Sequence, residues 1–189
     1  MRSNGNVITQ QIWWNNLSSD WQHALADNLE ITSQSPSANE LAAMRQITEL
    51  DLSGSAIDDL TPLYSFRELT KLDLSDTKIT DLTFLKNLSK LTELHMVCSH
   101  GLNVEELACL SGLEVLDISY PVIPLVGSLT LLERLPNLRE LFCNACDLTD
   151  VIPLIGLESL NTLSLSFNRI PHEEIEALSE LSPRCRILF

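Results

Sequence analysis

Two cysteines in the stretch "FCNACD" lie three residues apart, as Cys143 and Cys146. This spacing can hold a metal ion, carry out thiol–disulfide exchange, or serve packing alone. Residues three apart on an extended chain are separated by roughly 10 Å, more than the roughly 7 Å that a disulfide tolerates. A structural zinc site needs four ligands, and neither a second cysteine pair nor a nearby histidine completes the set. We therefore predict that both thiols are structural and that the protein has no metal site and no cofactor.

A second group of reactive residue types centres on His95, which has Asp73 22 residues before it and Asp117 22 residues after it. A histidine between carboxylates could take part in a metal site, but it more often forms an ordinary hydrogen-bonded cluster. Cys98 could be a nucleophile with His95 as its base, although their side chains need not converge. The sequence has no Gly-rich phosphate loop and no convincing catalytic triad. We expect no catalytic residues and no enzymatic activity, with a cysteine-dependent enzyme as the least favoured alternative.

These residues recur at a fixed interval because the chain from Ile47 onward is a tandem repeat. Six consecutive rows open with L-x-x-L-x-L or a close apolar variant of it. Four rows have 22 residues, the fourth and sixth have 25, and the closing "CRILF" matches the start of a seventh. Apolar positions 4 and 6 alternate with position 5, which is the period of a strand with one buried face. The six rows begin at Ile47, Leu69, Leu91, Leu113, Leu138 and Leu160.

Rows such as "LTKLDLSDTKITDLTFLKNL" resemble the leucine-rich repeat family, and most of all its short 22-residue class in bacterial internalins and phosphatase-regulatory subunits. The resemblance covers about three quarters of the chain. It implies an α/β solenoid in which parallel strands line a concave face and short turns or helical segments cover the convex face. The physics agrees, because one row cannot bury its own leucines and stacked rows bury a continuous column of them. In this register Cys143 takes position 6 and Cys146 position 9, which both face inward.

The segment before the repeats differs in character from the rows. We expect residues 1–46 to form a helical N-terminal cap and residues 47–189 to form the repeat solenoid, as one structural domain. Apolar residues at helical spacing predict one or two helices over about residues 10–28. A capping-box pattern predicts a short helix over about residues 38–45.

Two interpretations are open for the three tryptophans of this segment. The first row of a solenoid exposes a hydrophobic edge, and large aromatic side chains are efficient at covering it. The rings could instead form a cluster that binds a partner. We favour the cap, since terminal rows of repeat proteins are expected to be atypical. Leu29 and Ile31, which follow, could already be a rudimentary first strand.

The chain carries 12 Lys and Arg against 26 Asp and Glu, a net charge of −14. Such a surface repels polyanions, which argues against DNA or RNA as a partner and fits a partner with basic groups. No apolar run approaches the roughly 20 residues of a membrane-spanning helix, and the first residues lack the apolar core of a secretory signal. Five cysteines in no secreted-domain framework indicate free thiols. We predict a cytoplasmic protein, with an exported effector that lacks a Sec signal as the alternative.

Candidate binding residues follow from the strand geometry, because positions 3, 5, 7 and 8 of each row should point to the concave face. Early rows place carboxylates there and later rows place aromatic rings, which are plausible anchors for a partner. Aspartate at position 5 is usual in rows of the LDLS type, so those aspartates alone carry little information. The predicted partner-binding residues are His95, Val97, Tyr120, Phe142, Phe167, Asp73, Asp117, Glu93 and Glu140.

Rows three and four break the pattern, with Gly101 in an aliphatic position and three extra residues around Pro124 and Gly127. Irregular rows can mark function or simple drift. We predict a non-catalytic interaction module that binds another protein on its concave face, through a partner surface that is basic or apolar at its centre. The main alternative is the regulatory subunit of an enzyme, which shares the architecture but acts by masking or placing a catalytic site.

Overall fold

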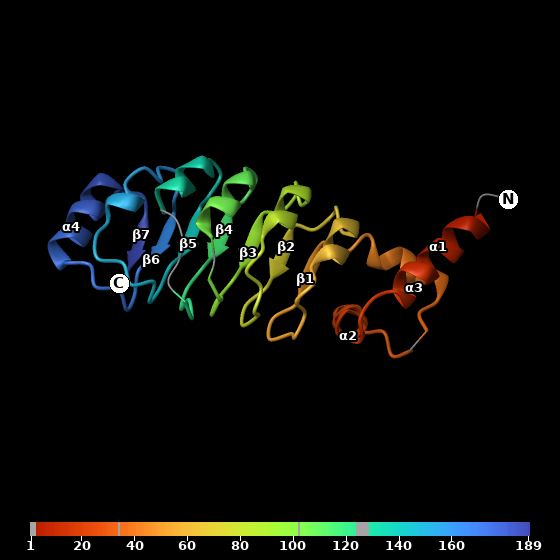
Figure 1. Cartoon of the computed structure of the whole chain (residues 1–189). Coiled ribbons are helices and arrows are strands. Elements are labelled where there is room, and N and C mark those ends of the chain that lie inside the picture. Colours follow the sequence, from red (N-terminus) through yellow and green to blue (C-terminus); the bar gives the residue numbers. More distant parts are fainter. Residues whose placement is uncertain (1–2, 34, 102, 124–128) are drawn as a thin grey trace.

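Seven short strands form one parallel sheet in the computed structural model, which describes residues 3–33, 35–101, 103–123 and 129–189 (Figure 1). The strands follow one another in chain order, so the rows before and after each row are its neighbours in the sheet. Each strand occupies positions 3 to 5 of its row and pairs with the same positions of the next row. The register predicted for the seventh row was wrong by one residue, because Arg186 pairs with Thr162 at position 3 and the sixth row therefore ends at Pro183. The strands are β1 (Glu49–Asp51), β2 (Lys71–Asp73), β3 (Glu93–His95), β4 (Val115–Asp117), β5 (Glu140–Phe142), β6 (Thr162–Ser164) and β7 (Arg186–Leu188).

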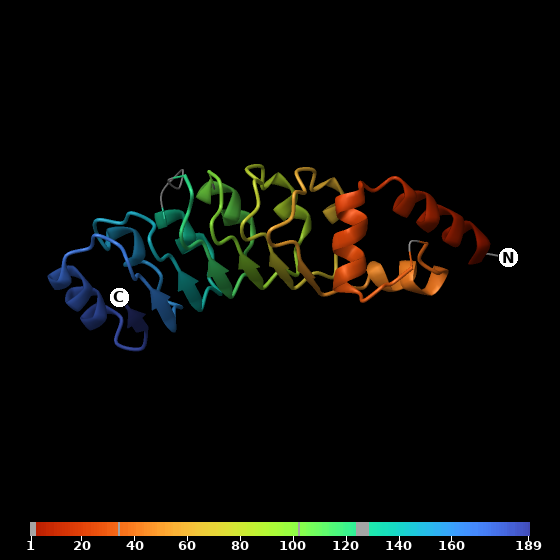
Figure 2. The same ribbon diagram turned by 90° about the horizontal axis from the view of Figure 1, so that it is seen from below.

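The segments that return the chain to the next strand lie on the side opposite the sheet (Figure 2). In rows one to five the return contains a 3-10 helix, whose i→i+3 bonds are illustrated by Leu63 N donating to Leu60 O at 3.0 Å. Short 3-10 turns suit connections of this length. In row six a longer helix turns Ile175 and Leu178 toward the core. These elements are η1 (Thr61–Ser65), η2 (Thr83–Asn87), η3 (Val104–Cys109), η4 (Leu129–Arg134), η5 (Ile152–Leu154) and α4 (His172–Leu181).

Two columns of apolar side chains run through the solenoid beneath the sheet. The residues at positions 4 and 6 of the first six rows are each at most 2 % exposed, which confirms the predicted register. Burying a Leu or Ile side chain fully contributes about 1.5–3 kcal/mol relative to leaving it exposed, so the columns dominate the stability of the stack. Position 4 holds Leu50, Leu72, Leu94, Leu116, Leu141 and Leu163; position 6 holds Leu52, Leu74, Met96, Ile118, Cys143 and Leu165.

Three helices form the N-terminal cap, α1 (Ser3–Asn15), α2 (Ser19–Asn28) and α3 (Ala38–Met44). Of the one or two helices predicted before residue 28, the structure has two, and the short third helix is confirmed. However, α1 begins at Ser3 rather than near residue 10, because the polar residues at its start give no apolar periodicity to detect. The capping box predicted for α3 is present, with Ser37 as the N-cap and Glu40 as its reciprocal partner. No helix in the described ranges is long and apolar enough to cross a membrane.

A single side chain closes the outer edge of β1. The amide of Asn28, at the end of α2, donates to the backbone O of Asp51 and accepts from its N–H, both at 2.8 Å. Asn28 thus reproduces the two bonds of a neighbouring strand and protects an edge that could otherwise pair with another chain. The prediction of a rudimentary strand at Leu29 and Ile31 was wrong, because Asn28 already occupies this edge. Both residues are instead half-buried against the core.

Trp21 fixes α2 on the first row. Its buried ring lies nearly parallel to that of Phe66, with centroids 6.4 Å apart, and its Nε1 donates to Asp59 O at 2.7 Å. Trp13 meets the same Phe66 ring edge-on at 5.9 Å. Trp14 is buried as well. These contacts are those of a cap, because the rings pack on the first row instead of facing outward.

Replacing Trp21 with alanine should lower the free energy of unfolding by about 3–5 kcal/mol, because the change empties a buried ring site. Urea unfolding followed by circular dichroism measures the difference. Ile12→Ala, at an exposed position of α1, is the control and should change stability by less than about 0.5 kcal/mol. If both variants proved equally stable, the helices would be an appendage and not a cap.

Candidate binding face

Strand positions 3 and 5 flank the buried position 4 and form the surface of the sheet. In β2 to β5 their side chains are partly exposed, as predicted for the concave face. The candidates located in this way are Asp73, Glu93, His95, Asp117, Glu140 and Phe142. In β6 position 5 is buried, because the Ser164 hydroxyl donates to Asn144 Oδ1 at 2.7 Å.

The aspartates at position 5 stabilise the turn that follows each strand. Oδ1 of Asp73 accepts from Ser75 N at 2.8 Å, and Oδ1 of Asp117 accepts from Ser119 N at 2.9 Å. A side-chain oxygen that binds the N–H two residues on is a common turn device. These carboxylates therefore have a structural role, and they also leave negative charge on the face.

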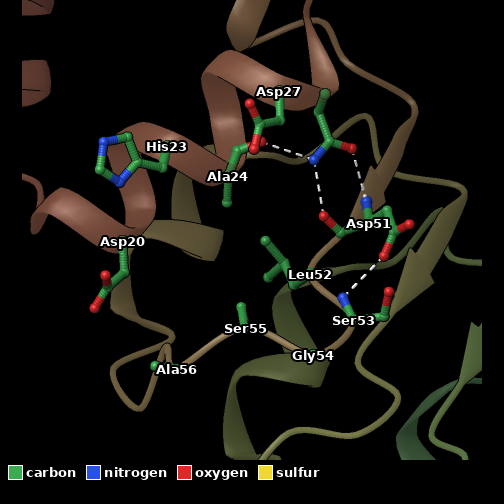
Figure 3. Close-up of a pocket in the computed structure, with 11 residues that line it drawn as sticks. Asp20, His23, Ala24, Asp27, Asp51, Leu52, Ser53, Gly54, Ser55 and Ala56 are labelled. Carbon is green, nitrogen blue, oxygen red and sulfur yellow. Dashed lines mark hydrogen bonds between the residues drawn. The ribbon is translucent and has the colours of Figure 1, made fainter.

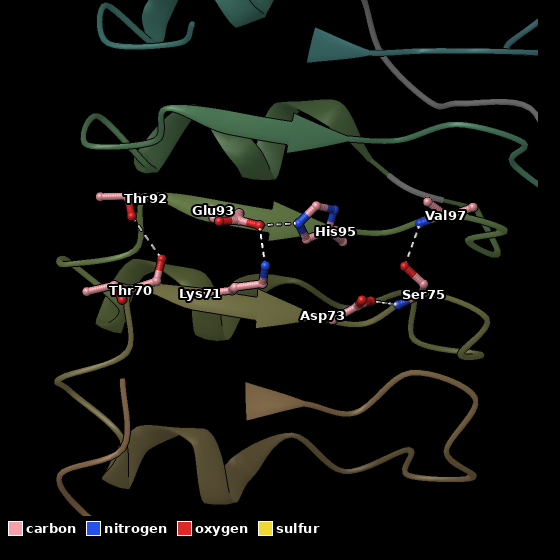
Figure 4. Close-up of polar contacts among 8 residues, drawn as sticks. All are labelled: Thr70, Lys71, Asp73, Ser75, Thr92, Glu93, His95 and Val97. Carbon is pink, nitrogen blue, oxygen red and sulfur yellow. Dashed lines mark hydrogen bonds and ion pairs between the residues drawn. The ribbon is translucent and has the colours of Figure 1, made fainter. Parts of the chain in front are cut away.

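Glu93 joins Lys71 and His95 into a polar cluster across β2 and β3 (Figure 4). Its Oε1 lies 2.5 Å from Lys71 Nζ and 2.7 Å from His95 Nε2. Partial burial raises the pKa of Glu93, but hydrogen bonds from Lys71 and His95 outweigh burial and hold this pKa below its usual value. The bond to Glu93 likewise raises the pKa of Lys71. His95 is paired in the sheet with Asp73 and Asp117, yet its ring binds the carboxylate of its own strand.

Position 8 of each of the first six rows has a left-handed backbone. Such φ values are easy for glycine and cost other residues roughly 1–2 kcal/mol, yet only the first row has glycine there. The turn sends these side chains out along the rim of the face. The residues and their φ angles are Gly54 (65°), Asp76 (54°), Cys98 (57°), Tyr120 (56°), Ala145 (52°) and Phe167 (63°).

Tyr120 and Phe167 form an exposed aromatic pair on this rim. Their ring centroids are 6.3 Å apart, their planes are inclined by 47°, and they are 45 % and 79 % exposed. The row between them has Ala145 at position 8, and this small side chain leaves room for the rings to meet. Exposure of both rings agrees with the prediction, but its cause is the left-handed turn and not strand alternation, since β4 and β6 end three residues earlier. Phe142 lies apart from the pair, half-buried on β5.

Sequence reasoning missed a ladder of polar side chains at position 7. Ser75 Oγ accepts from Val97 N at 3.1 Å, Ser119 Oγ accepts from Asn144 N at 3.1 Å, and Asn144 Oδ1 accepts from Ser166 N at 2.9 Å. Each side chain thus satisfies a backbone N–H of the following row. The recurrence of serine at position 7 of rows one, two, four and six was the available signal. Val97, a predicted binding residue, is half-buried within this ladder.

Solved structures with the same geometry include bacterial proteins. The chain superposes on an internalin, InlF of Listeria monocytogenes, with a TM-score of 0.65 and 22 % identity, over 90 % of this chain and 55 % of that one. A Leptospira interrogans LRR protein matches with a TM-score of 0.62 and 26 % identity, over 79 % of this chain and 39 % of that one. The protein is a leucine-rich repeat solenoid.

Other comparisons define how far this likeness extends. A structure of TLR13 in complex with ssRNA matches the leucine-rich repeat solenoid with a TM-score of 0.61 and 20 % identity, over 79 % of this chain and 22 % of that one. The solenoid therefore spans about half or less of the length of these three proteins. No protein-family profile and no curated protein matches the sequence.

In the leucine-rich repeat register, Cys143 and Cys146 are buried at the two predicted inward positions. Their Sγ atoms lie 3.6 Å from Ser164 O and 3.4 Å from Ile118 O, so each thiol acts as a weak donor. Burial raises the pKa of the Cys143 thiol well above its ordinary value and that of Cys146 to about 12. Thiols that stay protonated at neutral pH are poor nucleophiles and poor metal ligands. Their positions therefore favour packing over chemistry.

The remaining candidates for chemistry do not assemble into a site. Within the described ranges, no group of three or more His, Cys, Asp or Glu side chains is placed to hold a metal ion. A hollow of about 500 Å³ between α2 and the loop after β1 is lined by Asp20, His23, Asp27 and Asp51, among others (Figure 3). It marks the joint between the cap and the first row.

The irregular rows three and four are joined by an additional contact. His100 and Ile123 form an isolated parallel bridge, and Val122 N donates to Ser99 O at 2.9 Å. Val122 and Ile123 are both exposed and lie just after Tyr120. Residues 124–128, which include the predicted irregular positions in row four, are outside the described part of the chain.

The buried thiols should make stability depend on alkaline pH. An unperturbed thiol loses its proton near pH 9, whereas Cys146 in the folded chain does so at about 12. Between these values the unfolded chain binds fewer protons than the folded chain, so stability falls as pH rises. Cys146→Ser, which keeps a small donor at this position, should reduce the loss of stability between about pH 9 and 11. Urea unfolding across this range measures it, with Cys98→Ser at a half-buried position as the control; equal slopes in the wild type and both variants would contradict the assignment.

Proposed function

We propose that this protein is a non-catalytic binding module that holds another protein on its concave face, with Tyr120 and Phe167 as the apolar anchor. The observation that carries the proposal is the place of these two rings. Both occupy left-handed backbone positions, which favour glycine or asparagine, and both are exposed and in contact. Such residues contribute little to the core. The left-handed turn is common to all six rows, so rows four and six are distinguished by the exposed aromatic ring that they carry there.

The charge of the face supports a partner with basic residues around an apolar centre. Lys71 balances Glu93, whereas Asp73, Asp117 and Glu140 form no salt bridge within the described residues. With a net charge of −14, the surface attracts basic groups and steers them toward the rings. The same charge argues against a nucleic acid, although TLR13 was solved with ssRNA.

The architecture supports binding over catalysis. Repeat solenoids present an extended curved surface that many such proteins use to bind other proteins. Here burial raises the pKa of the Cys143 thiol, which disfavours the nucleophilic thiolate, and the His95 ring is held by Glu93 rather than by Cys98. The cytoplasmic location and the regulatory-subunit alternative stay predictions.

Replacing Tyr120 and Phe167 with asparagine together should weaken binding while leaving the fold intact or more stable. Asparagine tolerates the left-handed backbone better than an aromatic residue. Removing two anchors should reduce affinity by about 2 kcal/mol or more, roughly 30-fold. A protein captured by the wild type from its native host serves as ligand for calorimetry. The control is Asp76→Asn, at the same position of row two; binding that survived the double change would move the site away from the rim.

Charge on the face should act mainly on the rate of association. The Glu140 side chain is partly exposed and forms no hydrogen bond or salt bridge within the described chain, so Glu140→Gln changes charge alone. We expect a slower association rate, little change in dissociation, and a rate that falls as salt is added. Surface plasmon resonance with the captured partner measures both rates. The control Glu180→Gln, at an exposed position of α4, should leave both rates unchanged. Equal effects of the two variants would contradict a local role for Glu140.

A further inference from the structure

The rim of the concave face begins at a hollow beside α2. In Figure 1 the turns that follow the strands form the lower edge of the solenoid, and α2 lies beside the first of them. The hollow of about 500 Å³ occurs there, between α2 and residues 51–56 (Figure 3). Gly54 holds position 8 of this row, and even a Cβ atom added to it would meet no atom within 4 Å. The rim is therefore open at this place, where later rows carry a side chain.

The lining of the hollow suits a cation that can also donate hydrogen bonds. Asp20, Asp27 and Asp51 line it, and no Lys or Arg is among the described residues that do so. None of the three carboxylates forms an ion pair within the described chain. Ser55 lines the same hollow, and its Oγ is buried without a hydrogen-bond partner. Buried polar groups are normally hydrogen-bonded, so a ligand that donates to Ser55 would complete the site.

An arginine side chain fits this lining better than a metal ion does. Within the described ranges, no three acidic, His or Cys side chains are placed to hold a metal. A guanidinium is planar, carries its charge at any physiological pH and has five N–H donors, so it can meet separate carboxylates and a hydroxyl at once. The space of about 500 Å³ also lies in the range of ligand pockets, roughly 300–1,000 Å³.

A continuous backbone ladder connects the hollow to the aromatic pair. In rows one to five the N–H at position 8 donates to the position 7 carbonyl of the next row, as Gly54 N does to Ser75 O at 2.9 Å. Adjacent rows lie about 4.8 Å apart, so row five, which is midway between the two rings, is about 19 Å from row one. An extended chain covers this distance in about six residues. The side chains along the way, Asp76 and Cys98, are short and leave the line unobstructed.

We propose that this rim binds an extended segment of the partner protein that places an arginine in the hollow and an apolar residue six positions away on Tyr120 and Phe167. The inference rests on the proposed function for its apolar end and adds the second contact and the spacing. A helix would need about 13 residues to cover the same distance, at about 1.5 Å per residue. The spacing of the two anchors therefore distinguishes an extended segment from a helical one.

The probes are the peptides RTSTSTW and WTSTSTR, in which arginine and tryptophan are six positions apart in either chain order. In nuclear magnetic resonance of the full 189-residue protein, the better binder should shift the amides of residues 53–56 together with those of Tyr120 and Phe167. The same peptide with glutamate in place of arginine should bind about 3- to 10-fold more weakly, the range expected for two exposed ion pairs. RTSW, whose anchors are three positions apart, should bind no better than RTSTST, which has no apolar anchor.

Variants of the hollow test the arginine contact. Asp20→Asn combined with Asp27→Asn should weaken the arginine peptide by the same 3- to 10-fold and should not weaken the glutamate peptide. The control is Glu173→Gln combined with Glu180→Gln, which removes the same charge from α4 and should leave binding unchanged. Ser55→Ala should weaken the arginine peptide while the protein stays as stable or becomes more stable, because the Ser55 hydroxyl has no partner in the folded chain.

Three results would overturn the inference: equal affinity for RTSTSTW and RTSW, equal effects of the aspartate and glutamate variants, or no amide shifts at about 1 mM peptide. The asparagine double variant of Tyr120 and Phe167 separates this inference from the proposed function. If that variant still binds the captured partner, the proposed function fails. If it loses that partner while the aspartate variant binds both peptides like the wild type, only the inference about the hollow fails.

Discussion

The hydrogen bond that joins one row to the next determines the other features of this solenoid. The carbonyl at position 2 receives N–H groups of the following row, and this sets positions 4 and 6 of all rows in straight columns that can be buried. Because each strand has only three residues, the chain must turn at once. The left-handed residue at position 8 makes that turn. The same turn carries Tyr120 and Phe167 to the rim, so packing and recognition depend on one backbone arrangement.

Much of this architecture could be predicted from the sequence, because it depends on apolar spacing within one row. The strands, the inward cysteines and the capping helices belong to this class. The contacts of Asn28 with Asp51 and of Tyr120 with Phe167 could not, since they join residues of different elements whose side-chain directions no period encodes. His95 illustrates the same limit. The neighbouring aspartates were predicted from the register, but its ring bonds to Glu93 through a side-chain orientation that the repeat does not determine.

Some carboxylates of the binding face hold a turn in place, and others have no bonding partner. The sequence alone does not distinguish the two kinds. Asp73 and Asp117 are usual residues for such rows, and their bonds to Ser75 and Ser119 explain why. Glu140 occupies the same surface without any such bond, so its charge has no evident structural use. Residue type is therefore a poor guide to function here. What separates these carboxylates is whether the side chain already accepts a hydrogen bond from the backbone of its own row.

The cap and the first row are joined by side chains and not by a strand. Trp21 donates to the backbone of Asp59, and Asn28 bonds both backbone groups of Asp51. In a stack where each row is stabilised mainly by the rows beside it, order can begin at one joint and spread along the chain. Folding should therefore spread outward from the tryptophan layer, row by row. The protein would thus behave less like a two-state globule than like a chain of coupled rows.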